Sequence, residues 1–273
     1  MTKDFTDNGT TGASRRANVF VHIPYADRDR YMPLVLRDRI NPELYFNTKD
    51  LLELDRHQLK KVRDGLSVAR LSCTIHGPYM DLSIGAFDPE IRSVTRRRIM
   101  QSLKVASYLH AKTLVLHPGY TSFKYGEVLE DWLRNCESLL AEIGPVAAKS
   151  SIMIALENTF ENSPDVLCTL VDRLDAEVFG HCFDIGHFNV FARTDLSSWL
   201  RRVKGRLVEL HLHDNDGQSD QHLAVGDGTA DFRSLFSGLA ETLDRLVLTV
   251  EAHEESSVRR SLSRLEKLLG RAE

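Results

Sequence analysis

Short apolar runs alternate with longer amphipathic stretches along most of this chain, and that alternation restricts the fold to the α/β class. The runs are mostly continuous in hydrophobicity, as expected for parallel strands that are buried on both faces. We predict eight strands, at 18–23, 43–46, 72–76, 113–117, 152–157, 180–184, 207–213 and 246–251. Helical periodicity is clearest at 50–66, 89–109, 127–148, 232–243 and 258–269.

Two architectures fit eight strands that alternate with helices. An open, doubly wound sheet gathers its functional residues where the strand order reverses. Here polar residues follow the C-terminal ends of nearly all the strands, which is where a barrel of this class carries its chemistry. The sequence therefore favours a single (β/α)8 TIM barrel.

Composition sets few further limits. The 273 residues are 42% hydrophobic and 27% charged, values typical of a globular protein, and they suit one barrel domain at 18–273. The polar segment Met1–Ala17 lacks the apolar region of a signal peptide and is predicted to be a disordered tail. No apolar run is long enough to span a bilayer, so we expect a cytoplasmic protein without membrane partners.

Charge and cysteine content give no positive sign of nucleic-acid binding or of disulfide bonds. The net charge of -4 gives no electrostatic argument for nucleic-acid binding, although a local basic patch stays possible. The four cysteines include no CxxC pair, and we expect them to be buried and reduced. Trp132 and Trp199 are expected to pack in outer helices, and His57, His110 and His181 lie away from the strand ends.

Nine potential metal ligands fall at the predicted C-terminal strand ends or in the loops that follow them. They are His76, His117, Glu157, Asp184, His187, His211, Asp220, His222 and Glu251. Five of the chain's 11 histidines are in this set, a concentration that chance does not readily explain. Because imidazole and carboxylate ligands together suit zinc, manganese and related ions, we predict a divalent-metal site.

The motifs around these residues resemble a known group of enzymes. The segment from His76 to Leu82, the Leu156-Glu157-Asn158 step, the Asp184-Ile185-Gly186-His187 run and the 214–228 segment are similar to the xylose isomerase-like TIM-barrel superfamily. That superfamily includes sugar and sugar-phosphate isomerases and epimerases, and also the endonuclease IV type of DNA-repair enzyme. The resemblance extends from about Val19 to Glu251.

The resemblance implies two alternative sites. In the epimerase-like site, Glu157, Asp184, His211 and Glu251 hold one metal, the two glutamates transfer a proton, and His187 contacts the substrate. In the site of the endonuclease IV type, all nine residues hold three zinc ions for phosphoester hydrolysis.

Weaker expectations concern the substrate and its surroundings. Candidate substrate-binding residues are His22, Tyr25, Glu43, Asn158, His213 and Asp214, with His213 and Asp214 also expected to support metal ligands.

The predicted loops give no sign of a nucleic-acid partner, because the loop at 215–219 is short and acidic and no basic stripe is interleaved with aromatic residues. The leading hypothesis is a metal-dependent isomerase or epimerase of a small sugar or sugar phosphate. A zinc-dependent phosphoester hydrolase and a non-enzymatic binding barrel are the alternatives. The oligomeric state is left open.

Overall fold

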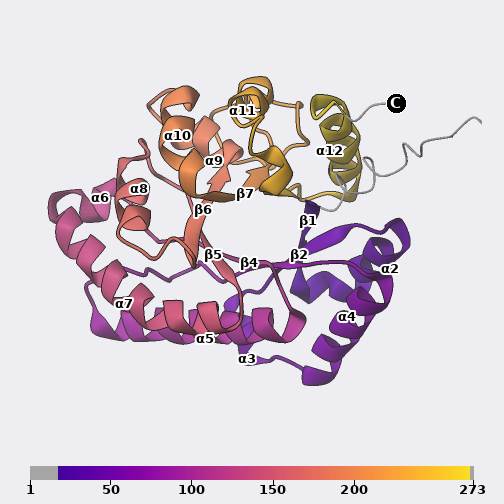
Figure 1. Ribbon diagram of the computed structural model, residues 1–273, viewed down its shortest axis with the longest axis horizontal. Helices are drawn as coiled ribbons and strands as arrows, with labels where there is room; N and C mark the ends of the chain where they lie inside the picture. Colours follow the sequence, from indigo (N-terminus) through magenta and orange to yellow (C-terminus); the bar gives the residue numbers. More distant parts are fainter. Residues whose placement is uncertain (1–17, 271–273) are drawn as a thin grey trace, which may run out of the picture.

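Eight parallel strands form a closed barrel in the order of the sequence, in a computed structural model that describes residues 18–270 (Figure 1). The strands are β1 (Val19–Pro24), β2 (Asn41–Tyr45), β3 (Thr74–His76), β4 (Thr113–Leu116), β5 (Met153–Glu157), β6 (Phe179–Asp184), β7 (Leu207–Leu212) and β8 (Val247–Val250). The predicted (β/α)8 barrel is thus confirmed. The predicted tail, Met1–Ala17, lies outside the described residues.

Helices surround the barrel (Figure 1). They are α2 (Arg28–Asp38), α3 (Thr48–Leu52), α4 (Arg56–Ala69), α5 (Pro89–Leu109), α6 (Ser122–Tyr125), α7 (Leu129–Lys149), α8 (Asp165–Asp172), α9 (Ile185–Phe191), α10 (Leu196–Val203), α11 (Phe232–Gly238) and α12 (Glu255–Leu268). Short 3-10 turns lie at Tyr25–Asp27, Gly126–Val128, Lys204–Arg206 and Leu243–Arg245.

The local sequence explains where several helices begin. Asp88 accepts a hydrogen bond from the Glu90 amide at the start of α5, with Pro89 as the first helical residue. The prediction of one helix at 50–66 was wrong, because Asp55 accepts hydrogen bonds from the next amides and starts α4 as a separate helix. Helices α2, α8, α9 and α10 were not predicted, since their 7 to 11 residues give too few turns for a clear periodicity.

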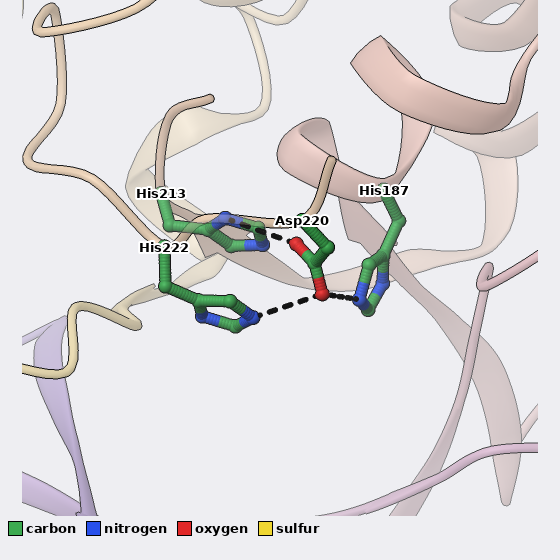
Figure 2. Close-up of side chains that lie close together, drawn as sticks. All are labelled: His187, His213, Asp220 and His222. Carbon is green, nitrogen blue, oxygen red and sulfur yellow. Dashed lines mark hydrogen bonds and ion pairs between the residues drawn. The ribbon is translucent and has the colours of Figure 1, made fainter. Parts of the chain in front are cut away.

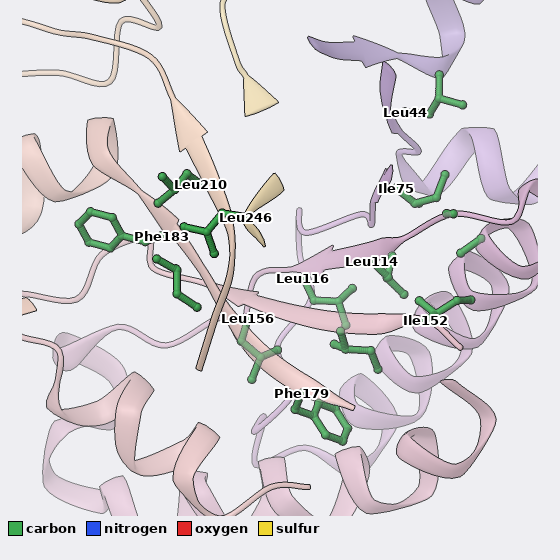
Figure 3. Close-up of a cluster of buried hydrophobic side chains, with 14 of the residues drawn as sticks. Leu44, Ile75, Leu114, Leu116, Ile152, Leu156, Phe179, Phe183, Leu210 and Leu246 are labelled. Carbon is green, nitrogen blue, oxygen red and sulfur yellow. The ribbon is translucent and has the colours of Figure 1, made fainter. Parts of the chain in front are cut away.

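The two faces of the barrel wall differ in chemistry. Leu114, Leu116 and Leu156 face the helices and belong to the large apolar core (Figure 3). Val115, between two of these leucines, packs instead with Ala155 and Cys182 in a small separate cluster. Strand residues therefore alternate between the helix-facing core and the barrel interior, as the period of two requires.

The remaining structural expectations agree with this arrangement. All four cysteines are buried and unpaired. Trp132 and Trp199 are 1% and 0% exposed, as expected for packing residues. Within residues 18–270, no helix combines the length and apolar character needed to cross a bilayer.

The packing of Trp132 gives a stability prediction. Its indole fills the space that a side chain at Gly85 would occupy, and it lies 5.1 Å from the Tyr120 ring, measured between ring centroids. Trp132→Ala should therefore lower the free energy of unfolding by about 3–5 kcal/mol. Urea denaturation followed by circular dichroism measures this change. Phe123→Ala is the control, because Phe123 is 98% exposed, and an equal loss in both variants would contradict the packing assignment.

Candidate functional site

The central feature of the barrel mouth is a buried carboxylate surrounded by imidazoles. Glu157, the last residue of β5, has Oε2 at 3.2 Å from His76 Nε2 and 3.0 Å from His117 Nε2. Its Oε1 lies 3.2 Å from His187 Nδ1 and 3.4 Å from His211 Nδ1. These histidines come from or follow four other strands, so barrel closure is what brings them to one carboxylate.

Glu157, Asp184, His211 and Glu251 form a central group whose ligand atoms all lie within 4.8 Å of one another. Three buried atoms of this group have no hydrogen-bond partner, namely Glu157 Oε1, His211 Nδ1 and Glu251 Oε2. Such orphaned polar atoms are costly unless another group satisfies them. Three oxygen ligands and one nitrogen ligand suit a divalent ion, so the residues present fit the metal that the sequence predicts.

Two further groups flank this central group. His76, His117 and Glu157 have ligand atoms within 4.8 Å of one another on one side. On the other side, Asp220 Oδ2 lies 3.4 Å from His187 Nε2 and 3.1 Å from His222 Nε2 (Figure 2). The nine sequence-predicted ligands are therefore all brought together, and they divide into three adjoining groups.

Three of the histidine rings are held so that one nitrogen of each faces a ligand group. His76 Nδ1 lies 2.8 Å from the Gly77 carbonyl oxygen, and His222 Nδ1 lies 2.8 Å from that of Glu251. Because a carbonyl oxygen only accepts, each of these nitrogens donates its proton, which leaves Nε2 as the ligand atom. His211 is fixed in the opposite sense, since its Nε2 donates to Glu43 Oε2 at 3.3 Å and Nδ1 faces the central group.

Asp184 has two structural tasks besides its place in the central group. It is the N-cap of α9, and its Oδ1 accepts a hydrogen bond of 2.6 Å from the His187 amide. The three-residue spacing of the Asp-Ile-Gly-His run therefore sets His187 one helical turn beyond Asp184. Asn158 ties the neighbouring strand ends together, because its side chain donates to the Asp184 carbonyl and accepts from the Asp184 amide.

The clustered charges change the acidity of the two glutamates. Burial alone raises the pKa of Glu157, but the facing imidazoles of His117 and His211 outweigh burial and hold that pKa well below its usual value. Burial also raises the pKa of Glu251, and the charges of His22 and His211 reverse the effect in the same way. Both carboxylates are thus ionised at neutral pH in the protein without metal, as metal ligation requires.

A second polar layer, which includes Glu43 and Glu209, lies beneath the mouth. Glu43 was predicted from the sequence as a candidate site residue, but Glu209 was not. Glu43 accepts from His22 Nδ1 at 2.9 Å and from His211, so it orients a metal ligand. Below it, Glu209 accepts hydrogen bonds from Thr113 and Thr249 at 2.5 and 2.6 Å. Burial and the nearby charge of Glu43 raise the pKa of Glu209 to about 8. Sequence reasoning missed Glu209 because it lies inside a strand and not at its end.

The six predicted substrate-binding residues separate into different environments. His22 lines the cavity at the barrel mouth, whereas Tyr25, Glu43, Asn158, His213 and Asp214 do not. Tyr25 is 4% exposed and stacks on Phe46, with 4.2 Å between ring centroids. The structure thus brings only His22 of this set to the cavity wall.

Asp214 organises the loop after β7. Its two carboxylate oxygens accept hydrogen bonds from four backbone amides, those of Asn215, Gly226, Gly228 and Ala230. A Cβ at position 228 would stand 2.5 Å from Asp214 Oδ1, so the close approach of this loop requires glycine there. The carboxylate is completely buried, and each oxygen already accepts two hydrogen bonds. Its role in holding the loop therefore accounts for an aspartate at this position.

The cavity above the glutamates has a volume of about 550 Å³ and extends outwards between α2 and α12. Tyr45, Tyr79, Phe160 and Phe191 contribute aromatic wall. Sequence reasoning missed all four, although Tyr45 ends β2 and Tyr79 follows His76 by three residues, positions that could have signalled them. Among the described residues, Arg259 is the single lysine or arginine that lines the cavity.

Comparison with known proteins assigns the family. The family described as the xylose isomerase-like TIM barrel matches residues 42–268, and the chain belongs to it. The TTHB071 protein of Thermus thermophilus, solved after soaking with ZnCl2, is 27% identical, with a TM-score of 0.80 over 94% of this chain and 99% of that one. A D-tagatose 3-epimerase-like protein is 23% identical, with a TM-score of 0.81 over 93% of this chain and 97% of that one, a likeness of fold.

Curated relatives match over shorter parts of the chain. The protein named MJ1311 from Methanocaldococcus jannaschii is 29% identical over 213 residues, which are 75% of this chain and 69% of the relative. A probable endonuclease 4 from Mycoplasmopsis synoviae is 24% identical over 160 residues, or 54% of this chain and 55% of the relative. The recognised superfamily is confirmed, and proteins named as sugar epimerases or epimerase-like are among the solved structures that share this fold.

Metal binding should release protons. Burial lowers the pKa of His76 and of His222, but Glu157 and Asp220 respectively outweigh it and raise both values to about 9. At pH 7 these imidazoles are therefore protonated in the metal-free protein, and an ion must displace the protons. Apparent zinc affinity should rise between pH 6 and 8, by about tenfold per pH unit for each proton displaced.

Isothermal titration calorimetry measures this release, since the observed heat changes with the ionisation enthalpy of the buffer. His57→Ala is the control, because His57 lies on α4 away from the mouth. An affinity that stays constant from pH 6 to 8 would show that the rings are neutral before the metal binds.

Proposed function

We propose that this chain is a metal-dependent isomerase or epimerase that acts on a small sugar. The observation that carries the proposal is the pair Glu157 and Glu251, which converge from β5 and the end of β8 on one ligand group; Glu251 lines the cavity, and Glu157 is buried beside it. His211 Nδ1 lies 3.4 Å from one glutamate and 2.9 Å from the other, so both carboxylates adjoin one ligand set.

Two facing carboxylates suit proton transfer at carbon. One glutamate removes the proton from a carbon next to a carbonyl, and the electrons of the broken C–H bond move to form an enediolate. The other glutamate, which rests ionised and must first take up a proton from solvent, returns that proton to the opposite face and so inverts the centre. A divalent ion in the central group would polarise the carbonyl and the neighbouring hydroxyl. His187, whose Nδ1 lies 3.2 Å from Glu157 Oε1, would orient that carboxylate.

The cavity wall supports a small, largely uncharged substrate. Tyr79 stacks on His117 with 4.5 Å between ring centroids, and Tyr45 stacks on Tyr79 at 5.6 Å, which gives an amphipathic surface next to the ligands. Arg259, the cation at the cavity's outer end, already pairs with Glu255 at 2.8 Å and Asp38 at 3.6 Å. Away from the ligand groups, the described wall therefore offers a phosphate no free lysine or arginine, which favours an unphosphorylated sugar over a sugar phosphate or a nucleic-acid backbone.

Isotope exchange tests the proposal directly. The protein loaded with manganese or zinc should convert a ketose to its epimer or aldose, and deuterium from D2O should enter the product at the inverted or newly formed C–H centre. A panel of ketopentoses and ketohexoses analysed by mass spectrometry and NMR provides the measurement. The proposal would be abandoned if the fully metallated protein formed no new isomer and exchanged no carbon-bound hydrogen with any member of the panel.

Substitution of Glu251 tests whether this residue takes part in proton transfer. Glu251→Gln should lower turnover by about 10²–10⁴-fold, since the amide cannot take up or deliver the proton. Glu142→Gln is the matched control, because Glu142 pairs with Arg96 on the outer helices. Metal content measured on each variant shows how much of the loss comes from the weakened ligand set. Full turnover in Glu251→Gln would remove this residue from the mechanism.

The three adjoining ligand groups favour a second candidate, a zinc-dependent phosphoester hydrolase. The two functions differ in their need for His117, which belongs to a flanking group. In an epimerase that uses the central group, His117→Ala should reduce the bound metal while kcat stays within about tenfold. In a hydrolase that uses all three groups, the same change should abolish cleavage of a chromogenic phosphodiester. Parallel assays of both reactions decide between them.

A further inference from the structure

His213 is buried beside the flanking group of His187, Asp220 and His222 (Figure 2). One of its ring nitrogens, Nδ1, has no hydrogen-bond partner. Its Nε2 lies 3.0 Å from Asp184 Oδ2. An ionised carboxylate only accepts, so Nε2 donates to it, and in the neutral ring Nδ1 then offers its lone pair. The residue is 0% exposed, which means that bulk solvent does not satisfy that lone pair.

The free nitrogen faces the flanking ligand group. His213 Nδ1 lies 3.8 Å from Asp220 Oδ1, while the other oxygen of the same carboxylate faces His187 and His222. One ligand atom from each of the four residues lies within 4.8 Å of the others. Ligand atoms around a tetrahedral zinc ion are roughly 3.4 Å apart, so small side-chain shifts would close this shell.

The backbone next to this site is shaped to admit the ring. A Cβ on Gly186 would stand 2.0 Å from His213 Cε1 and 2.4 Å from its Nδ1, so any other residue at 186 would displace the imidazole. The opposite side is closed by His222, whose ring stacks on that of His213 at 3.8 Å and 3°. His222 itself has a φ of 50°, an unfavourable value for a side-chain-bearing residue that sets its ring against His213.

We propose that His213 Nδ1 is a fourth protein ligand, with His187, Asp220 and His222, for a divalent ion, most suitably zinc. Three imidazoles and one carboxylate would complete a tetrahedral shell and leave no position for water. Closed shells of this kind are structural, whereas catalytic zinc sites keep an open position. This ion would clamp the loop after β7 to the start of α9, and chemistry would be left to the central group.

The inference concerns metal binding and does not depend on the reaction that the chain catalyses. It also bears on the choice between an epimerase and a phosphoester hydrolase. An ion in a closed shell could not contact a phosphoester directly, so at most two ions would be left for hydrolysis. Loss of this ion should loosen the segment that carries Asp220 and His222 without removing Glu157 or Glu251 from the central group.

Anomalous diffraction at the zinc edge, on crystals of the zinc-loaded full chain, tests the proposal. A peak is expected among the four residues, with His213 Nδ1 about 2.0–2.1 Å from it. In His213→Gln, the amide nitrogen can still donate to Asp184, but the Nδ1 ligand is gone. That variant should lose this peak and one zinc ion per chain by elemental analysis, or bind that ion at least tenfold more weakly, while the central peak persists.

His253→Gln is the matched control, because His253 stacks on the other side of His222 at 4.2 Å and belongs to no ligand group in the described chain. It should keep every ion. The proposal is overturned if the wild-type peak is absent or lies more than 3 Å from Nδ1, a result that needs no variant to fold. It is also overturned if His213→Gln keeps the peak at full height, or loses the central peak instead, since the residue would then act only through Asp184.

Discussion

The barrel mouth depends on one buried carboxylate, Glu157, and on the four histidines within 3.4 Å of it. A buried charge is tolerated only when opposite charges or metal ions compensate its lost hydration. Protons on the imidazoles can do so without metal, and a divalent ion can do so when bound. The same residue therefore links the stability of the mouth, its acidity and its ligand chemistry.

The wall beneath the mouth makes this concentration of charge possible. Its outer face is apolar and packs on the helices, which leaves the inner face free to carry polar side chains such as Glu43, Glu209 and Thr249. Each of these has a hydrogen-bond partner inside the barrel. The polar interior also fixes the ring of His211, so the orientation of a candidate metal ligand is set from below and not by the loops above.

Individual residues show how far sequence reasoning reached. The nine candidate ligands follow from one rule, that strand ends of a barrel share a mouth, and all nine do meet there. That rule does not say which way a side chain points, so it offered Tyr25, Asn158 and Asp214 as substrate-binding candidates. None of the three lines the cavity, and each packs on or forms hydrogen bonds with its neighbours. Tyr45 and Tyr79, in contrast, line the cavity but were not predicted to, because an aromatic residue at or near a strand end is also typical of core packing.

The sequence by itself determined the barrel class, the approximate positions of the strands and the identity of the candidate ligands, because hydrophobic period and residue type are local properties. Only the tertiary structure decided how those ligands divide into groups, which ring nitrogen several of the histidines leave free, and that His213 adjoins Asp220 and does not line the cavity. These outcomes depend on distances of a few ångströms between side chains far apart in the chain. Such distances are fixed by the register and closure of the strands, and no local pattern records them.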